Sequence, residues 1–341
     1  MSEPSQRVDG PAGPGEAAPT VTNVDLRTSG AEAMTSSPEE LERLKEILES
    51  SGNYRVLRRS GATRVFTPTD SAAVDGLHRG VYLDVETTGL DSSDKIIELG
   101  LVVFEYDATG TVYRVVDELD EFEDPGRPLP QAIVELTGIT DEQVRGRSIS
   151  DTEVARVAAG ADLVIAHNAG FDRPIVEKRF PFFKAAAWAC SVMDVDWSRA
   201  GIRNRKLEYL AMMRGFYFDS HRAINDCLAG VELLSSALAP EAEETALANL
   251  LANARREGVR LWAESSPFES KDLLKSRKYR WNATAKTWWR DLFADEHDAE
   301  LDWLAGSVYP QRRALPYLRV DATLRYSSRL PGAPPRDALR K

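Results

Sequence analysis

Apolar and polar residues follow two different periods along this chain. Between residues 80 and 238, short apolar runs typical of buried strands are interspersed with segments whose apolar residues recur every three or four positions, as in amphipathic helices. Three strand-like runs come first and helices then alternate with strands, which predicts an α/β domain whose sheet begins with hairpins. We expect strands near 80–87, 96–106, 111–118, 162–167 and 187–194, and helices near 130–137, 151–159, 206–214 and 222–238, with another helix starting at Phe171.

The segments on either side of this domain have patterns of their own. Residues 37–40 (SPEE) have the form of a capping box at a helix start, and Gly52 is a stop signal for that helix. Residues 54–67 are typical of two short strands joined near Ser60. Beyond Pro240 we expect a helix at 245–256 and a small α+β region with strands near 259–263, 287–292 and 318–326.

These patterns divide the chain into predicted regions. The N-terminal segment is rich in Gly, Pro, Ala and Ser and lacks apolar periodicity, so it cannot offset the entropy cost of ordering. The regions are a disordered tail (1–35), a helix, hairpin and linker (36–79), the α/β domain (80–238), a linker helix with a small α+β domain (239–330), and a flexible tail (331–341). The predicted hairpin carries four basic residues, Arg55, Arg58, Arg59 and Arg64. A solvated strand face is the favoured interpretation of these residues, and contact with a phosphate backbone is the alternative.

Composition and charge narrow the class of protein. The 341 residues are 43% hydrophobic, which is normal for a folded chain, and two cysteines are too few for a disulfide framework. The net charge of −11 argues against a wholly basic nucleic-acid coat protein but says nothing about local patches. No apolar run approaches the roughly 18 residues of a membrane span, and the first residues lack the pattern of an export signal. We therefore expect a cytoplasmic protein with no membrane contact.

The first strand carries two carboxylates one residue apart. In VYLDVETTGL (81–90), Asp84 and Glu86 project from the same face because side chains alternate along a strand. If that face is buried, each charge costs several kcal/mol or so to desolvate, and the two charges repel each other. The pair is therefore tolerated on a buried face only with a bound cation, and the rest of the sequence has to indicate whether one is expected.

Two later segments hold further polar candidates. HNAGFD (167–172) lies where an apolar strand gives way to a helix, which is where α/β sheets place their sites. HRAIND (221–226) puts His221 near a helix start and Asp226 inside a helix otherwise patterned for burial. Taken singly, Asp172 is more typical of a helix cap and His221 of a surface histidine. The order of the two segments in the chain, after the Asp84–Glu86 pair, favours an active-site role for both residues.

The chain order DxETTGL, HNxxFD and HRAxxD resembles the three motifs of the DEDD superfamily of exonucleases, in its His-containing DnaQ-like branch. That branch includes the proofreading epsilon subunit of bacterial DNA polymerase III. The segments KIIELGLVVF, LTGITDEQV and KLEYLAMMRGF also resemble family members, although some relatives have His where Thr137 stands. The resemblance covers residues 80–238. It implies a ribonuclease-H-like fold, a mixed five-stranded sheet flanked by helices with an antiparallel second strand, to which the small C-terminal α+β domain is added.

The resemblance also implies the chemistry. Asp84, Glu86, Asp172 and Asp226 would hold two divalent cations, Mg²⁺ or Mn²⁺, because hard oxygen ligands favour these over Zn²⁺. Two such ions can clamp a phosphate, activate a water and stabilise the departing 3′ oxygen. Asp84 would bridge both ions and His221 would take the proton of the water. The implied function is a 3′–5′ exonuclease that releases nucleoside 5′-monophosphates from single-stranded or frayed DNA ends.

Substrate contacts are expected in two places. The backbone and hydroxyls of Thr87, Thr88 and Gly89 suit an approach to the terminal nucleotide, with an ordinary strand-ending turn as an equal alternative. In the C-terminal region, residues 271–290 hold seven basic side chains against Asp272 alone, with interleaved aromatics. This composition suits single-stranded nucleic acid, and a small-domain core is an equally favoured interpretation. The C-terminal residues selected as contacts are Lys275, Lys278 and Trp288.

Two other functions remain open at this point. An RNA exonuclease of the same branch would carry the same motifs, because the motifs do not sense a 2′ hydroxyl. A nucleic-acid-binding adaptor without hydrolysis is the non-enzymatic alternative, which the full set of four acids with His221 disfavours. The expected partner is nucleic acid, DNA rather than RNA. Because no polymerase-sized region is present, proofreading would need a polymerase or repair partner.

Overall fold

The structure is a computed structural model that describes residues 37–61, 63–68, 76–91, 93–239 and 241–340. It divides into two compact units, Met1–Arg55 and Val56–Lys341. In the first unit, α1 (Pro38–Ser50) is the helix that the capping pattern predicts, and Ser37 Oγ accepts a hydrogen bond from the Glu40 amide at 3.2 Å. The predicted tail at 1–35 and much of the predicted linker lie outside the described residues.

The second unit contains a mixed five-stranded sheet in the order β4-β3-β2-β5-β6. β2 pairs antiparallel with β3, and β3 with β4, whereas β5 runs parallel to both β2 and β6. The predicted ribonuclease-H-like sheet with an antiparallel second strand is confirmed. Its strands are β2 (His78–Thr87), β3 (Ile96–Tyr106), β4 (Val112–Phe122), β5 (Leu163–Ala166) and β6 (Trp188–Cys190).

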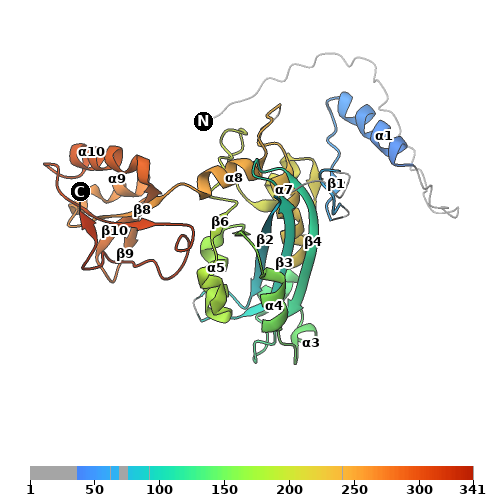
Figure 1. Cartoon of the computed structure of the whole chain (residues 1–341), viewed down its shortest axis with the longest axis horizontal. Helices are drawn as coiled ribbons and strands as arrows, with labels where there is room; N and C mark the ends of the chain where they lie inside the picture. The colour runs from blue at the N-terminus through green and yellow to red at the C-terminus, as the bar shows by residue number, and fades with distance from the viewer. Residues whose placement is uncertain (1–36, 62, 69–75, 92, 240, 341) are drawn as a thin grey trace, which may run out of the picture. The chain divides into compact units, whose positions relative to one another are not determined.

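Helices cover both faces of this sheet (Figure 1). Val81, Leu83 and Val85 pack in one hydrophobic cluster with α4 and α5, whereas Tyr82 packs in the other with α6, α7 and α8. Because side chains alternate along β2, Asp84 and Glu86 share the Tyr82 face, toward α7. The helices are α2 (Gln131–Thr137), α3 (Asp141–Val144), α4 (Asp151–Ala158), α5 (Ala169–Arg179), α6 (Leu207–Met213), α7 (Ala223–Ser235) and α8 (Ala246–Ala254), with a 3₁₀ turn at Pro181–Ala185.

The start of α7 lies directly on the sheet. Gly100 of β3 is paired with Asp84 of β2, and a Cβ on Gly100 would lie 2.5 Å from the carbonyl carbon of Ala223. Only glycine leaves room for this approach. The Cys227 thiol, one turn further along α7, donates to the Gly100 carbonyl oxygen at 3.3 Å. The first turn of α7, which contains Asp226, is thereby held beside Asp84.

The predicted hairpin at 54–67 is wrong. β1 (Arg58–Arg59) pairs in parallel with β7 (Phe216–Tyr217), and Val65 forms an isolated antiparallel bridge with Arg114 of β4. Each half of the segment therefore pairs with the α/β domain instead of with the other half. The arginines serve this docking, because they form ion pairs within the protein: Arg58 with Glu232, Arg59 with Asp219 and Arg64 with Glu118.

A second, antiparallel five-stranded sheet follows α8, in the order β12-β11-β8-β10-β9. The helices α9 and α10 pack against one face of this sheet, where they share a hydrophobic cluster with it (Figure 1). The predicted strands near 259 and 287 are present, and β9 and β12 are additional. The elements are β8 (Gly258–Ala263), α9 (Lys271–Ser276), β9 (Arg280–Asn282), β10 (Thr287–Phe293), α10 (His297–Ser307), β11 (Pro316–Val320) and β12 (Leu339–Arg340), with 3₁₀ turns at Phe268–Ser270 and Ala294–Glu296.

The predicted strand at 318–326 is wrong in its second half. β11 ends at Val320, and residues 321–330 instead pack on the α/β domain: the Ala322 carbonyl accepts from the Trp188 amide of β6 at 2.9 Å. The segment leaves its own sheet because β6 is an edge strand with backbone groups to satisfy. Residues 331–340, predicted as a flexible tail, return to the second sheet, where β12 pairs antiparallel with β11.

None of the helices in the described ranges combines the length and the apolar character that crossing a bilayer requires.

Candidate active site

Three carboxylates from two elements meet on the α7 side of the first sheet. Asp84 and Glu86 come from the end of β2, and Asp226 comes from the first turn of α7. One oxygen from each of these three groups lies within 4.8 Å of the others. The sequence placed these residues 142 positions apart at the extremes, and the close approach of α7 at Gly100 brings them together.

Asp172 joins this cluster from α5. The helix begins after Asn168, whose φ of 76° is left-handed, so the chain turns sharply out of β5 at the same end of the sheet where β2 ends. Asp172 is 2% exposed, and its carboxylate accepts hydrogen bonds from its own amide and from the Val85 amide. Its Oδ2 is buried and has no hydrogen-bond partner. One carboxylate oxygen is thus held by backbone amides while the other is left without a donor.

The electrostatics of the cluster are unfavourable for four negative charges. Burial raises the pKa of Asp84 well above its usual range, and the neighbouring charges of Asp172, Asp226 and Glu86 raise it further. Burial is also the main reason that the pKa of Glu86 and that of Asp172 are each raised to about 8. The pKa of Asp226 is raised to about 7, again chiefly by burial. Without a cation, protons must occupy part of this site near neutral pH.

These residues fit a divalent cation. The donors are all carboxylate oxygens, which are the hard ligands that Mg²⁺ and Mn²⁺ prefer. The unpartnered Oδ2 of Asp172 is the kind of buried acceptor that otherwise costs free energy, and a cation would satisfy it. The same positive charge would offset the repulsion that raises the pKa values.

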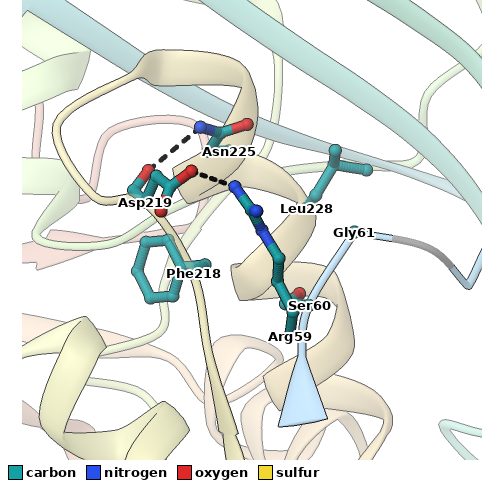
Figure 2. A pocket seen from close by; sticks show the side chains of 7 residues that line it. All are labelled: Arg59, Ser60, Gly61, Phe218, Asp219, Asn225 and Leu228. Atoms are coloured by element: carbon teal, nitrogen blue, oxygen red, sulfur yellow. Dashed lines mark hydrogen bonds and ion pairs between the residues drawn. The ribbon is translucent and has the colours of Figure 1, made fainter. Parts of the chain in front are cut away.

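His221 lies in the loop before α7, as expected, with a left-handed φ of 64°. Its side chain is 42% exposed, and its Nε2 lies 3.7 Å from Oε1 of Glu208 in α6. The loop is held from two sides, as Figure 2 shows: Arg59 forms an ion pair with the Asp219 carboxylate, and Asn225 Nδ2 donates to the Asp219 carbonyl oxygen at 3.0 Å. The imidazole is therefore accessible to solvent on a fixed loop beside Asp226.

The sequence patterns missed a buried acid next to the site. Glu98 of β3 is fully buried, and its carboxylate accepts from Arg222 and from the Ala223 amide at the start of α7. Asp120 of β4 shares a hydrogen bond with Glu98, and burial together with this neighbour raises the pKa of Asp120 to about 6. A charged residue inside the apolar run IIELGLVVF was the signal that could have revealed Glu98.

The turn after β2 uses its hydroxyls internally. Thr87 Oγ1 donates to the Gly89 carbonyl oxygen at 2.6 Å, and Thr88 Oγ1 donates to Asp94 Oδ1 at 2.7 Å. A Cβ on Gly89 would lie 2.5 Å from the Asp94 carboxylate, so the glycine makes room for this acid. The hydroxyl protons of both threonines are committed within the turn, and their contact with a substrate terminus stays a prediction.

The C-terminal residues predicted to contact substrate have different environments. Lys275 and Lys278 are exposed at the end of α9 and just beyond it. Trp288 is only 8% exposed and belongs to the hydrophobic cluster under α9 and α10. Its selection as a surface contact needs correction: the exposed tryptophan of this region is its cross-strand neighbour Trp281, which is 50% exposed. Trp288 faces the core because α9 and α10 cover its side of β10.

The α/β domain matches a known family. Residues 81–234 match the model of the exonuclease family RNase_T. They form an exonuclease-family domain. The first and last acids of the cluster, Asp84 and Asp226, both lie within this range.

The chain is similar to parts of much longer proteins. It is 32% identical over 172 residues to the PolC-type DNA polymerase III of Clostridium perfringens, a match that covers 48% of this chain and 11% of the relative. It is 37% identical over 162 residues to the PolC-type DNA polymerase III of Halalkalibacterium halodurans, covering 45% of this chain and 11% of the relative. The chain therefore spans about a tenth of the length of these curated relatives.

Among solved structures, the chain is similar to exonuclease X in complex with 5′ overhanging duplex DNA. The two are 23% identical, the match covers 50% of this chain and 99% of that chain, and the TM-score is 0.37.

Proposed function

We propose that the protein is a metal-dependent 3′–5′ exonuclease that removes nucleoside 5′-monophosphates from single-stranded or frayed DNA ends. One observation carries the proposal: four carboxylates from β2, α5 and α7 converge, and one of them has a buried oxygen without a donor. In structural ion-pair networks acidic side chains lie next to basic partners, whereas in this cluster the acidic side chains lie next to one another. The exonuclease-family match over the same residues supports this interpretation.

Asp84, Glu86, Asp172 and Asp226 would hold two divalent cations, Mg²⁺ or Mn²⁺. Bound cations of this kind supply Lewis-acid stabilisation of the charge that develops on the phosphate and on the leaving oxygen. Asp84 is central to the cluster, because each of the other three acids contributes to raising its pKa, and it would therefore contribute most to holding the positive charge of the ions. Asp172 is oriented by two backbone amides, which leaves Oδ2 as its free ligand atom.

His221 would act as the general base. A water attacks the terminal phosphorus and gives its proton to the imidazole, while the bond from phosphorus to the 3′ oxygen breaks and that oxygen leaves with the shortened strand. The exposed position of His221 lets it exchange the proton with solvent, and Glu208 Oε1 at 3.7 Å can attract the imidazolium. General-base catalysis of this type contributes about 10²- to 10⁴-fold to a rate.

A polymerase or a repair complex is the partner that we propose. The curated relatives are named as PolC-type DNA polymerase III, and this chain matches 11% of their length.

A product-resolved assay tests this function. The purified chain is incubated with matched DNA and RNA oligonucleotides that carry a 5′ label, with Mg²⁺ or with EDTA. We expect a ladder of products shortened from the 3′ end and mononucleotide release on DNA, both abolished by EDTA. Shortening of RNA alone would favour the RNA exonuclease, and binding of oligonucleotides without any shortening would favour the adaptor.

A further inference from the structure

The second sheet presents an exposed tryptophan on an edge strand. β9 has β10 as its neighbour and ends the sheet on that side. Trp281, in the middle of β9, is 50% exposed, and its ring lies 5.3 Å from that of the buried Trp288. An indole that packs against a buried ring and is still half exposed to solvent can stack on a nucleobase.

Exposed cations without acidic partners accompany this tryptophan. Four of the five basic side chains in residues 275–286 are exposed and form no ion pair among the described residues. By contrast, Arg277 and Arg290 both pair with the buried Glu300 and hold the domain together. We use the name β9 patch for Trp281 with these four residues, Lys275, Lys278, Arg280 and Lys286.

Two of these lysines occupy backbone positions that favour glycine. Lys278 follows α9 with a φ of 68°, and Lys286 ends the β9–β10 loop with a φ of 50°. A side chain with a Cβ is disfavoured in this left-handed region, where glycine is the usual residue. Lysine at both positions costs backbone stability but places a cation in each of the two segments that flank β9, the strand that carries Trp281. Strained residues of this kind cluster at functional surfaces.

Charge and shape point to one occupant. The chain as a whole carries −11, so a cationic segment stands out from its surroundings and attracts a polyanion. Arg280 lies on the opposite face of β9 from Trp281, where its guanidinium is 5.3 Å from the Trp289 ring centroid. Arg280 is exposed on that face, so a flexible chain running along the edge of the sheet can reach both Trp281 and Arg280. A single nucleic-acid strand provides the phosphates for the cations and the bases for the indole.

We propose that the β9 patch binds single-stranded DNA, with Trp281 stacking on a base and Lys278 and Lys286 contacting phosphates. The proposal rests on the proposed function in one respect: the bound strand is the one whose 3′ end is hydrolysed. A second contact on the same strand raises the effective concentration of the end at the active site.

Glycine substitutions of the two left-handed lysines distinguish a DNA-binding role from a structural role, because glycine removes the charge and favours the same backbone conformation. Full-length Lys278→Gly and Lys286→Gly are compared with the parent for binding of a fluorescein-labelled 30-mer of thymidylate in EDTA, which prevents hydrolysis. We expect each substitution to weaken binding several-fold and to lower the slope of log K against log salt by about 0.7. The same substitutions should leave Tm unchanged or raise it by about 2 °C. Trp281→Ala should weaken binding by about tenfold, as expected for the loss of one stacked base.

Matched controls separate the patch from general effects. Ser265→Gly changes another exposed left-handed residue of the same domain, with φ of 54°, without removing a charge. Lys184→Ala removes one exposed charge from the exonuclease domain. Both controls should bind the 30-mer as the parent does. Equal binding by parent, Lys278→Gly, Lys286→Gly and Trp281→Ala would overturn the proposal, as would tighter binding of the matched RNA or equal competition by a poly-glutamate peptide.

A small substrate distinguishes this proposal from the proposed function. The p-nitrophenyl ester of thymidine 5′-phosphate needs only the active site, so all patch variants should hydrolyse it at the parental rate, while their KM for the 30-mer rises. A parent chain that hydrolyses neither substrate but binds the 30-mer through the patch would refute the exonuclease activity and leave the β9 patch supported. Hydrolysis of both substrates by the parent, with no loss of 30-mer binding in the patch variants, would support the exonuclease activity and overturn the proposal for the β9 patch.

Discussion

Arg222 donates two hydrogen bonds to Oε1 of Glu98, from Nε at 2.9 Å and from Nη2 at 2.8 Å, and the Glu98 side chain is fully buried. The other oxygen of Glu98 accepts the Ala223 amide at 2.9 Å, so one buried carboxylate binds both a side chain and the first amide of α7. Arg222 stands between His221 and Asp226 in the chain. The Glu98–Arg222 pair therefore fixes the start of the helix that carries part of the site.

The first prediction concerns this pair. Glu98→Ala should lower the free energy of unfolding by about 3–5 kcal/mol, because it leaves the Arg222 guanidinium and the Ala223 amide without their acceptor. Urea denaturation measures the loss. Glu118→Ala on β4 is the control, since its ion pair with Arg64 is half-exposed and should be worth less than about 1 kcal/mol. Equal losses in the two variants would contradict the role assigned to Glu98.

The second prediction concerns charge in the metal-free cluster. Burial raises the pKa of Asp84 in the folded state, so the folded protein binds more protons than the unfolded chain, and stability falls as the pH rises above about 4. Asp84→Asn removes this penalty and should raise the free energy of unfolding in EDTA on the order of 2 kcal/mol at pH 8, with a smaller gain at pH 5.

The same variant should lose the response to metal. In the parent, Mg²⁺ at about 100 times its Kd should add about 2.7 kcal/mol of stability, because it binds only the folded cluster. Asp84→Asn should show little of this increase and no hydrolysis. Thermal unfolding with EDTA and with Mg²⁺ measures both effects, and a parental response to Mg²⁺ in the variant would count against the proposed ligand set.

The third prediction separates the base from the fold. His221→Ala should reduce the single-turnover rate about 10²-fold or more, because the attacking water loses its proton acceptor. The Tm and the stabilisation by Mg²⁺ should stay at parental values, since the His221 side chain is 42% exposed and has its nearest acidic partner, Glu208 Oε1, at 3.7 Å. A variant that keeps the parental rate would exclude His221 as the base.

The fourth prediction concerns the residue next to Asp172. The Arg173 guanidinium is fully buried, donates to the Ala322 and Arg325 carbonyl oxygens at 3.1 and 2.6 Å, and pairs with Glu177. Arg173→Ala should cost about 3–5 kcal/mol, because it breaks the buried ion pair with Glu177 and removes the donor to the Arg325 carbonyl oxygen. Lys178→Ala, at an exposed position of the same helix, should stay within about 0.5 kcal/mol of the parent.

Comparison of these two variants by urea denaturation tests the attachment of the 321–330 segment. In the Arg173→Ala protein, limited proteolysis should cut residues 321–330 sooner than in the parent, because the segment loses hydrogen bonds to α5. Proteolysis at the parental rate would show that other contacts suffice to hold the segment.

The fifth prediction is a pH dependence that comes from His167. Its Nε2 must donate to the Arg205 carbonyl oxygen at 2.8 Å, so its Nδ1, at 2.8 Å from Ser191 Oγ, accepts from that hydroxyl. Burial lowers the pKa of His167 to about 4. The unfolded chain therefore binds more protons between about pH 6.5 and 4, and stability is lost as the pH falls through this window.

His167→Gln removes the titrating group while keeping a donor and an acceptor. The free-energy difference between the parent and this variant should shift by about 1–3 kcal/mol in favour of the variant when the pH is lowered from 7.5 to 5. Urea denaturation at the two pH values measures it. A difference that does not change with pH would mean that His167 titrates normally in the folded protein.

Much of the exonuclease domain could be predicted from the sequence because the relevant signals are local. Strand and helix periods depend on residues a few positions apart, and the placement of Asp84 and Glu86 on one face follows from strand geometry alone. The order of the three motifs was enough to indicate the family. The residues that meet at the site were therefore all selected from the sequence, although only the structure shows that Asp172 has a free, buried oxygen.

Edges and pairings were decided by the tertiary structure. Residues 54–67 have the pattern of a hairpin, but strands β7 and β4 offered partners, and residues 321–326 left their own sheet for the edge of β6. A strand pattern indicates that backbone groups need hydrogen-bond partners, but it does not identify the partner strand, because strand pairing is non-local. Trp281 and Trp288 lie opposite each other on the same face of the sheet, and Trp281 is the exposed one because its strand, β9, is at the edge of the sheet. Local patterns thus specify most helices and strands of the exonuclease domain and the acids of its site, whereas the packing of segments distant in the chain specifies the partners of the edge strands and the exposed faces.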